Sequence, residues 1–91
     1  MSNGETVWKL SSKAHYGLVH DDPVLIHEDQ EDAFRLYESA ACFIELCDGQ
    51  RSVDEIIEMI VEDFEVSEGQ LALDLAPFIE AMSEDGFIEV V

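Results

Sequence analysis

The first part of the chain carries short apolar segments separated by turn and loop signals, and this pattern predicts an antiparallel sheet. Strands are expected over residues 13–19, 24–27 and 33–37, where apolar and polar side chains tend to alternate. Residues 20–23 read His-Asp-Asp-Pro, which favours a turn because Pro restricts φ and Asp bonds to its own backbone. Residues 28–32 form an acidic loop. We therefore expect a three-stranded antiparallel meander.

From residue 38 onward the apolar period changes to the helical one, which predicts three helices. Residues 48–49, Asp-Gly, end the first helix in a tight turn, because Gly adopts the left-handed conformation easily. Residues 52–55 and 67–70 both carry the capping-box pattern that begins a helix. Residues 85–86 end the third helix. The apolar stripe of the first helix is Ala40, Phe43, Ile44 and Cys47. That of the second helix is Val53, Ile56, Ile57, Ile60, Val61 and Phe64. That of the third helix is Leu71, Leu75, Phe78, Ile79 and Met82.

The length of the chain indicates a single domain, because 91 residues leave no room for a second hydrophobic core. We expect residues 1–12 to be a flexible N-terminal segment and residues 13–91 to be the folded domain. The predicted class is α+β, with a three-stranded antiparallel sheet followed by three helices.

The charge of the chain is strongly negative: 22 acidic residues against 4 Lys and Arg give a formal net charge of -18. Such a field repels phosphate backbones, so binding to nucleic acid is disfavoured. It favours cationic or neutral partners and keeps the chain soluble. A solvated acidic surface without a partner is the alternative interpretation.

The location indicated by the sequence is the cytoplasm. No apolar run approaches the roughly 20 residues that cross a bilayer, and the first residues lack the apolar core of a signal peptide. We expect no membrane partner. Cys42 and Cys47 are spaced badly for a disulfide or a metal pair, so they are interpreted as buried thiols that act as small apolar side chains.

No group of residues predicts catalysis. His15, His20 and His27 lack a partner at metal-ligand spacing and are interpreted as surface or structural residues. Neighbouring acids such as Glu62 and Asp63 lie on polar helix faces, as solvated residues do. Because no serine elbow or phosphate loop is present either, we expect a non-enzyme with no catalytic residues, no cofactor and no metal site.

A binding surface is the remaining candidate. The strand over residues 33–37 carries only one charge, Arg35, whereas natural sheet edges are usually protected by charges, Pro or bulges. If this strand is an edge, its unpaired N–H and C=O groups can accept an extended peptide as a further strand. If it is central or covered by a helix, it cannot. The periodicity alone leaves both alternatives open.

Several segments resemble one protein family. Residues 39–41 read Ser-Ala-Ala, and residues 44–57 read Ile-Glu-Leu-Cys-Asp-Gly-Gln-Arg-Ser-Val-Asp-Glu-Ile-Ile. Residues 73–79 read Leu-Asp-Leu-Ala-Pro-Phe-Ile, and Asp-Gly-Phe-Ile follows at residues 85–88. Together with the order of strands and helices over residues 13–91, these segments resemble the PqqD family. Its members are RiPP recognition elements, which bind the leader segment of a ribosomally made precursor peptide.

The resemblance implies a winged-helix-like fold in which the leader pairs with the third strand and lies against the third helix. The peptide-binding residues that it implies in this chain are Ala33, Phe34, Arg35, Leu36, Tyr37, Leu71, Asp74, Leu75 and Phe78. Tyr37 and Pro77 depart from the family pattern near this site. An interior Pro removes a helical hydrogen bond, and we expect packing to accommodate a local kink.

The function that the resemblance implies is non-catalytic delivery of the precursor to a separate modifying enzyme, such as a radical-SAM maturase, a cyclase or a leader peptidase. The strong acidity suggests a leader with basic residues. The resemblance does not distinguish between pyrroloquinoline quinone, a lasso peptide and another compound as the product made from the precursor. A winged-helix nucleic-acid-binding regulator and an acidic protein–protein adaptor are the alternatives, and an unpaired sheet edge also leaves a homodimer open.

Overall fold

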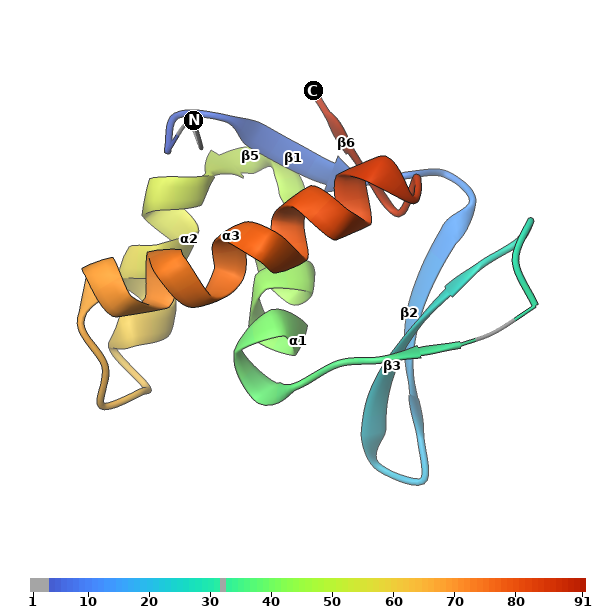
Figure 1. Ribbon diagram of the computed structural model, residues 1–91, viewed down its shortest axis with the longest axis horizontal. Helices are drawn as coiled ribbons and strands as arrows, with labels where there is room; N and C mark the ends of the chain where they lie inside the picture. Colours follow the sequence, from blue (N-terminus) through green and yellow to red (C-terminus); the bar gives the residue numbers. More distant parts are fainter. Residues whose placement is uncertain (1–3, 32) are drawn as a thin grey trace.

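Within residues 4–31 and 33–91, which the computed structural model describes, the chain forms two three-stranded sheets and three helices (Figure 1). The elements in chain order are β1 (Val7–Leu10), β2 (Ala14–Val19), β3 (Asp22–His27), β4 (Phe34–Arg35), α1 (Glu38–Leu46), β5 (Asp48–Ser52), α2 (Val53–Val61), α3 (Glu68–Glu84) and β6 (Ile88–Val90). The antiparallel sheet expected before the helices is made of β2, β3 and β4, and the predicted α+β class is confirmed.

The first sheet has the order β2-β3-β4 and extends away from the helices at one end of the molecule (Figure 1). His20 and Asp21 both have positive φ, 52° and 70°, and make the two-residue turn between β2 and β3. Asp22 and Pro23, expected in the turn, are already part of β3.

The third strand is shorter than the sequence predicts, and Pro23 provides the reason. The Leu36 N–H donates to the Pro23 carbonyl oxygen at 3.0 Å. Pro23 has no N–H to donate in return, so the ladder stops here. Tyr37 then becomes the N-cap residue of α1. Instead of spanning residues 33–37, β4 is confined to Phe34–Arg35.

A second sheet, β5-β1-β6, has no counterpart among the sequence-based expectations. Its central strand is β1, so the expectation that residues 1–12 are flexible is wrong for Val7–Leu10. The physical reason is that the partners of β1 come from distant parts of the chain: Lys9 lies opposite both Asp48 and Glu89. Residues 1–3 of the expected flexible segment lie outside the described residues.

The helix ends follow the local signals in most cases. The Ser52 side chain and the Glu55 side chain make both hydrogen bonds of a capping box at the start of α2. Ser67 accepts from the Gln70 N–H at 3.1 Å, but the Gln70 side chain donates to Asp74 instead of completing the box. Gly49, expected in a turn, has φ 82° and lies in β5 directly after α1.

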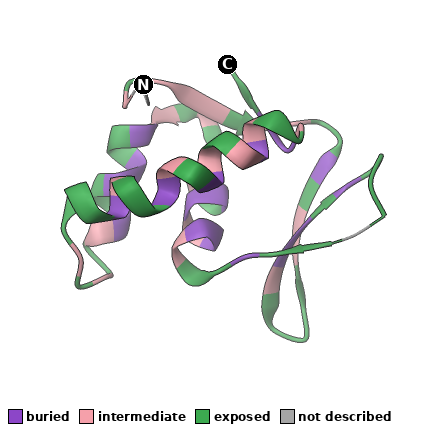
Figure 2. Ribbon diagram, viewed as in Figure 1, coloured by how far each residue is buried: buried purple, intermediate pink, exposed green. Residues whose placement is uncertain are grey.

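The buried residues lie where the helices face one another and the first sheet (Figure 2). Helix α2 ends at Val61, and Phe64 packs half-buried against the core from the following loop. The largest fully buried residues are Leu25, Phe43, Ile56, Ile60, Leu71, Leu75, Met82 and Phe87. These residues come from β3, all three helices and the segment after α3, so one core joins the sheet to the helices.

Candidate functional site

Strand β4 is an edge of the first sheet, since it pairs with β3 on one side only within the described residues. The sequence leaves open whether this strand is an edge or a central strand, and in the structure it is an edge. Although Arg35 places one charge on it, this short edge offers backbone groups to an extended chain.

The direction of the backbone groups in β4 follows from its pairing. The Leu36 N–H points toward β3, because it donates to Pro23. Successive residues of a strand direct their N–H and C=O groups to opposite edges. The Arg35 N–H and C=O therefore point away from β3, toward the open side of the sheet. Arg35 is the residue of β4 whose backbone is available for an added strand.

The side chains of β4 have different surroundings. Phe34 is half-exposed, and its ring meets Phe87 at 6.3 Å between centroids. Arg35 is exposed and pairs with Asp22 at 3.0 Å. Leu36, directly after β4, is buried in the core. The Phe34–Phe87 contact joins β4 to the segment after α3, and no local sequence signal indicates it, because the two residues are far apart in the chain.

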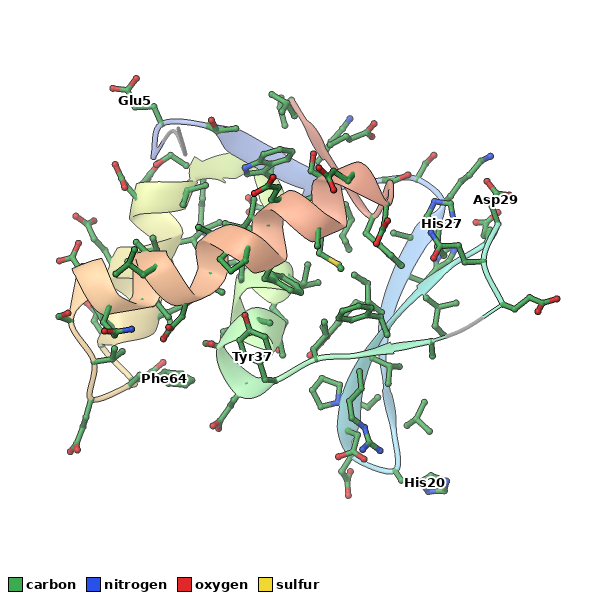
Figure 3. All side chains as sticks on the ribbon, in the orientation of Figure 1. Glu5, His20, His27, Asp29, Tyr37 and Phe64 are labelled. Atoms are coloured by element: carbon green, nitrogen blue, oxygen red, sulfur yellow. The ribbon has the colours of Figure 1, made fainter. Side chains whose placement is uncertain are left out.

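Tyr37 connects the end of β4 to α3, and Figure 3 shows its side chain between the chain leading into α1 and the helix α3. Its hydroxyl donates to the carbonyl oxygen of Asp74 at 3.3 Å, and its ring meets Phe78 edge-on at 5.9 Å. Burial, and then the charge of Asp74, raise the pKa of Tyr37, so the phenol stays protonated and can donate this bond. The side chain is nevertheless 50% exposed.

The predicted residues of α3 divide into surface and core. Asp74 is exposed, and its carboxylate accepts from the Gln70 side chain at 3.1 Å. Phe78 lies at the margin of the core, 7% exposed. Leu71 and Leu75 are 2% and 0% exposed, so the structure does not support the prediction that they contact a peptide. Their place on the apolar stripe is explained by packing against the rest of the core.

The exposed residues Phe34, Arg35, Tyr37 and Asp74, with Phe78 against the Tyr37 ring at the margin of the core, are called here the β4–α3 surface. Ala33 is exposed just before β4. The surface combines outward backbone groups, partly accessible aromatic rings and a carboxylate. Such a combination suits an extended peptide that places apolar side chains against α3.

Other kinds of site find little support in the part of the chain that the structure describes. There, no three His, Cys, Asp or Glu side chains lie close enough together to hold a metal ion. His15 pairs with Glu28 at 2.8 Å, and His27 is buried with its Nδ1 accepting from the Asp29 N–H. Among the same residues, no helix is both long and apolar enough to cross a membrane.

Comparisons with known proteins bear on the family and the fold. The sequence model of the family described as "Coenzyme PQQ synthesis protein D (PqqD)" matches residues 23–88. A solved structure described as "TbiB1 in Complex with the TbiA(beta) Leader Peptide" is similar in fold, with a TM-score of 0.76 and 22% sequence identity. The match covers 89% of this chain and 94% of that one. A search of curated proteins found no match.

The family match spans β3, β4, all three helices and the beginning of β6, and therefore contains the whole β4–α3 surface. The similarity to TbiB1 extends further along the chain and supports a shared fold. With most of its length matched by the family model, the chain belongs to the PqqD family, described as Coenzyme PQQ synthesis protein D.

Proposed function

We propose that this chain binds the leader segment of a ribosomally made precursor peptide at the β4–α3 surface and catalyses no reaction itself. The observation that carries the proposal is the outward backbone of Arg35 at the β4 edge of the sheet, whose end the Tyr37–Asp74 hydrogen bond ties to α3. The fold shared with TbiB1, a protein solved with a leader peptide, supports it.

The mechanism that fits this surface is addition of the leader as a fourth strand next to β4. Backbone hydrogen bonds to Arg35 would supply affinity, and side-chain contacts would supply specificity. Phe34, Tyr37 and Phe78 offer aromatic contacts to every second leader residue. Asp74, at the rim, offers a carboxylate to a basic or amide group. The charge of -18 favours a leader with basic residues through faster association.

The biological step is delivery of a substrate. A leader held by this chain brings the attached core peptide to a separate modifying enzyme at high effective concentration. A radical-SAM maturase, a cyclase and a leader peptidase are the enzyme classes that require such delivery. The cytoplasm is the proposed location, and the free thiols of Cys42 and Cys47 suit its reducing conditions.

A binding titration tests the proposal. Short open reading frames next to this gene supply candidate leader sequences, and the probe is such a leader made as a fluorescein-labelled peptide. Arg35→Pro removes the outward N–H and should weaken binding about tenfold or more, because a leader carbonyl is left unpaired. Arg35→Gln keeps the N–H and removes only the pair with Asp22, so its binding should stay near that of the wild type.

Leu18→Pro is the matched control. The Glu28 N–H donates to the Lys13 carbonyl at 3.0 Å, so the backbone groups of Lys13 point toward β3. Because these groups alternate in direction along β2, the Leu18 N–H points away from β3, at the opposite edge of the sheet from β4. Its substitution should leave leader binding unchanged. Equal binding by the folded Arg35→Pro variant and the wild type would exclude the β4 edge as the binding site.

A further inference from the structure

A cleft of about 210 Å³ opens between α1 and α2, apart from the β4–α3 surface. It is lined by Cys42, Glu45, Leu46, Met59, Ile60 and Asp63. None of these residues belongs to the proposed leader site. Pockets for drug-sized ligands measure roughly 300–1,000 Å³, so this cleft has room for one long side chain instead.

The floor of the cleft is apolar and its rim is anionic. Ile60 is buried and Leu46 half-buried, whereas Met59 is 40% exposed and has a flexible thioether that adapts to what it contacts. The rim carries the carboxylates of Glu45 and Asp63, both exposed. An apolar floor with a carboxylate rim matches a side chain that has an aliphatic stem and a cationic end.

No internal cation neutralises this rim within the described residues. The four Lys and Arg residues of the chain are all outside the helices, and each is paired elsewhere: Lys9 with Glu89, Lys13 with Asp29, Arg35 with Asp22, and Arg51 with Asp48. No Lys, Arg or His occurs after Arg51. Glu45 Oε2 accepts from the Tyr16 hydroxyl at 2.8 Å, a neutral donor that leaves the carboxylate charge in place.

The thiol at the cleft responds to this negative potential. Burial is the largest effect that raises the pKa of Cys42, and the charges of Glu45, Glu38 and Asp63 raise it further. Three carboxylates therefore act on one point of the cleft in the same direction. A cation bound there would meet their combined field without displacing any existing ion pair.

We propose that the α1–α2 cleft binds an arginine side chain of a partner protein, with its stem on Leu46, Met59 and Ile60 and its guanidinium between Glu45 and Asp63. Arginine fits better than lysine, because the guanidinium is weakly hydrated and can bond two carboxylates at once. The assignment of that partner as the modifying enzyme rests on the proposed function, whereas the binding of the guanidinium does not. The cleft would then hold the enzyme while the β4–α3 surface holds the leader.

The test uses n-butylguanidinium as the probe and n-butylurea as its neutral counterpart of the same shape, followed by the NMR signals of the Met59 and Leu46 methyl groups. We expect saturable shifts with n-butylguanidinium, with a dissociation constant on the order of 10 mM for a ligand of this size. n-Butylurea should give no saturable shift. Equal shifts from both probes, or none from either, would overturn the proposal.

Matched charge variants separate the cleft from general attraction to an acidic protein. Glu45→Gln and Asp63→Asn should each weaken n-butylguanidinium binding about two- to fivefold. Glu68→Gln and Glu80→Gln remove the same charge from exposed positions on α3 and should have no effect. Equal weakening by all four variants would show diffuse attraction and contradict the cleft.

Leader binding is measured on the same variants, so that a failure of the proposed leader site can be distinguished from a failure of the proposed arginine site in the cleft. The doubly substituted Glu45→Gln, Asp63→Asn protein should keep wild-type affinity for the labelled leader while losing n-butylguanidinium binding. If the wild type binds n-butylguanidinium but not the leader, the cleft stands and the proposed function fails. Loss of leader binding in the folded double variant would contradict the separation of the two sites.

Discussion

The hydroxyl of Tyr37 donates a hydrogen bond to the main-chain carbonyl of Asp74 at 3.3 Å, and this contact ties the end of β4 to α3. The ring of Tyr37 also covers the edge of Phe78. Because Tyr37 lies between β4 and α1, this contact fixes the end of β4 relative to α3. The arrangement of the β4–α3 surface therefore depends on this residue.

Tyr37→Phe should lower the free energy of unfolding by about 0.5–1 kcal/mol, because it removes the hydroxyl bond and keeps the ring. Tyr37→Ala should cost more, because Phe78 also loses its aromatic neighbour. Urea denaturation followed by circular dichroism measures both. Equal costs for the two variants would show that the ring contact contributes nothing.

Ser52→Ala should lower the free energy of unfolding by about 1 kcal/mol, because it removes the capping of α2. Ser52 Oγ accepts from the Glu55 N–H at 3.2 Å, and Glu55 Oε1 accepts from the Ser52 N–H at 3.1 Å. Ser12→Ala, at an exposed position before β2, is the control and should leave the urea midpoint unchanged. Indistinguishable midpoints for the two variants would contradict the capping box.

Stability should fall as the pH rises above 9, because burial and then the charge of Asp48 raise the pKa of Cys47 from 9.0 to about 12. The unfolded thiol ionises near 9.0, whereas the folded thiol stays protonated. The stabilisation is therefore full below pH 9 and is lost as the pH rises toward 12. At pH 10 the loss is on the order of 1 kcal/mol.

The measurement is urea unfolding between pH 7 and pH 10 under reducing conditions. Cys47→Ala is the comparison, and it lowers stability at every pH because it leaves a space in the core. Its free energy of unfolding should, however, change less with pH over this interval than that of the wild type. Parallel curves for the variant and the wild type would show that Cys47 does not cause the pH dependence.

Asp74→Asn should weaken leader binding only mildly, and by less as the salt concentration rises, because exposed charges mainly affect the association rate. A salt-independent effect of Asp74→Asn would contradict the rim position.

Phe78→Ala should weaken leader binding strongly, by about 2 kcal/mol or more if the ring contacts the leader. The fold of this variant must be checked by circular dichroism, since Phe78 is mostly buried.

The parts of this fold that the sequence predicts are those with local signals. Ser52 and Ser67 begin helices because the capping residues are neighbours, and the change of apolar period separates the first sheet from α1. The second sheet lacks such signals: Lys9 pairs with residues from β5 and β6, and pairing over such distances leaves no mark within a short segment.

The candidate site could be predicted only in part for a related reason. An apolar stripe on a helix does not say whether it faces the core or a ligand, and Leu75 turns out to be in the core. The position of β4 at the edge, and the outward N–H of Arg35, depend on strand order. Strand order is a property of the whole sheet, which periodicity within one strand cannot give.

The exchange rate of the Arg35 backbone amide, measured by NMR with and without the leader peptide, tests the central claim most directly. In the free chain this N–H points to the open side of the sheet and should exchange quickly. If the leader pairs with β4, saturation should slow its exchange about tenfold or more, while the outward amide of Leu18 on the opposite edge stays unchanged. An unchanged Arg35 amide in a saturated complex would contradict leader binding by strand addition.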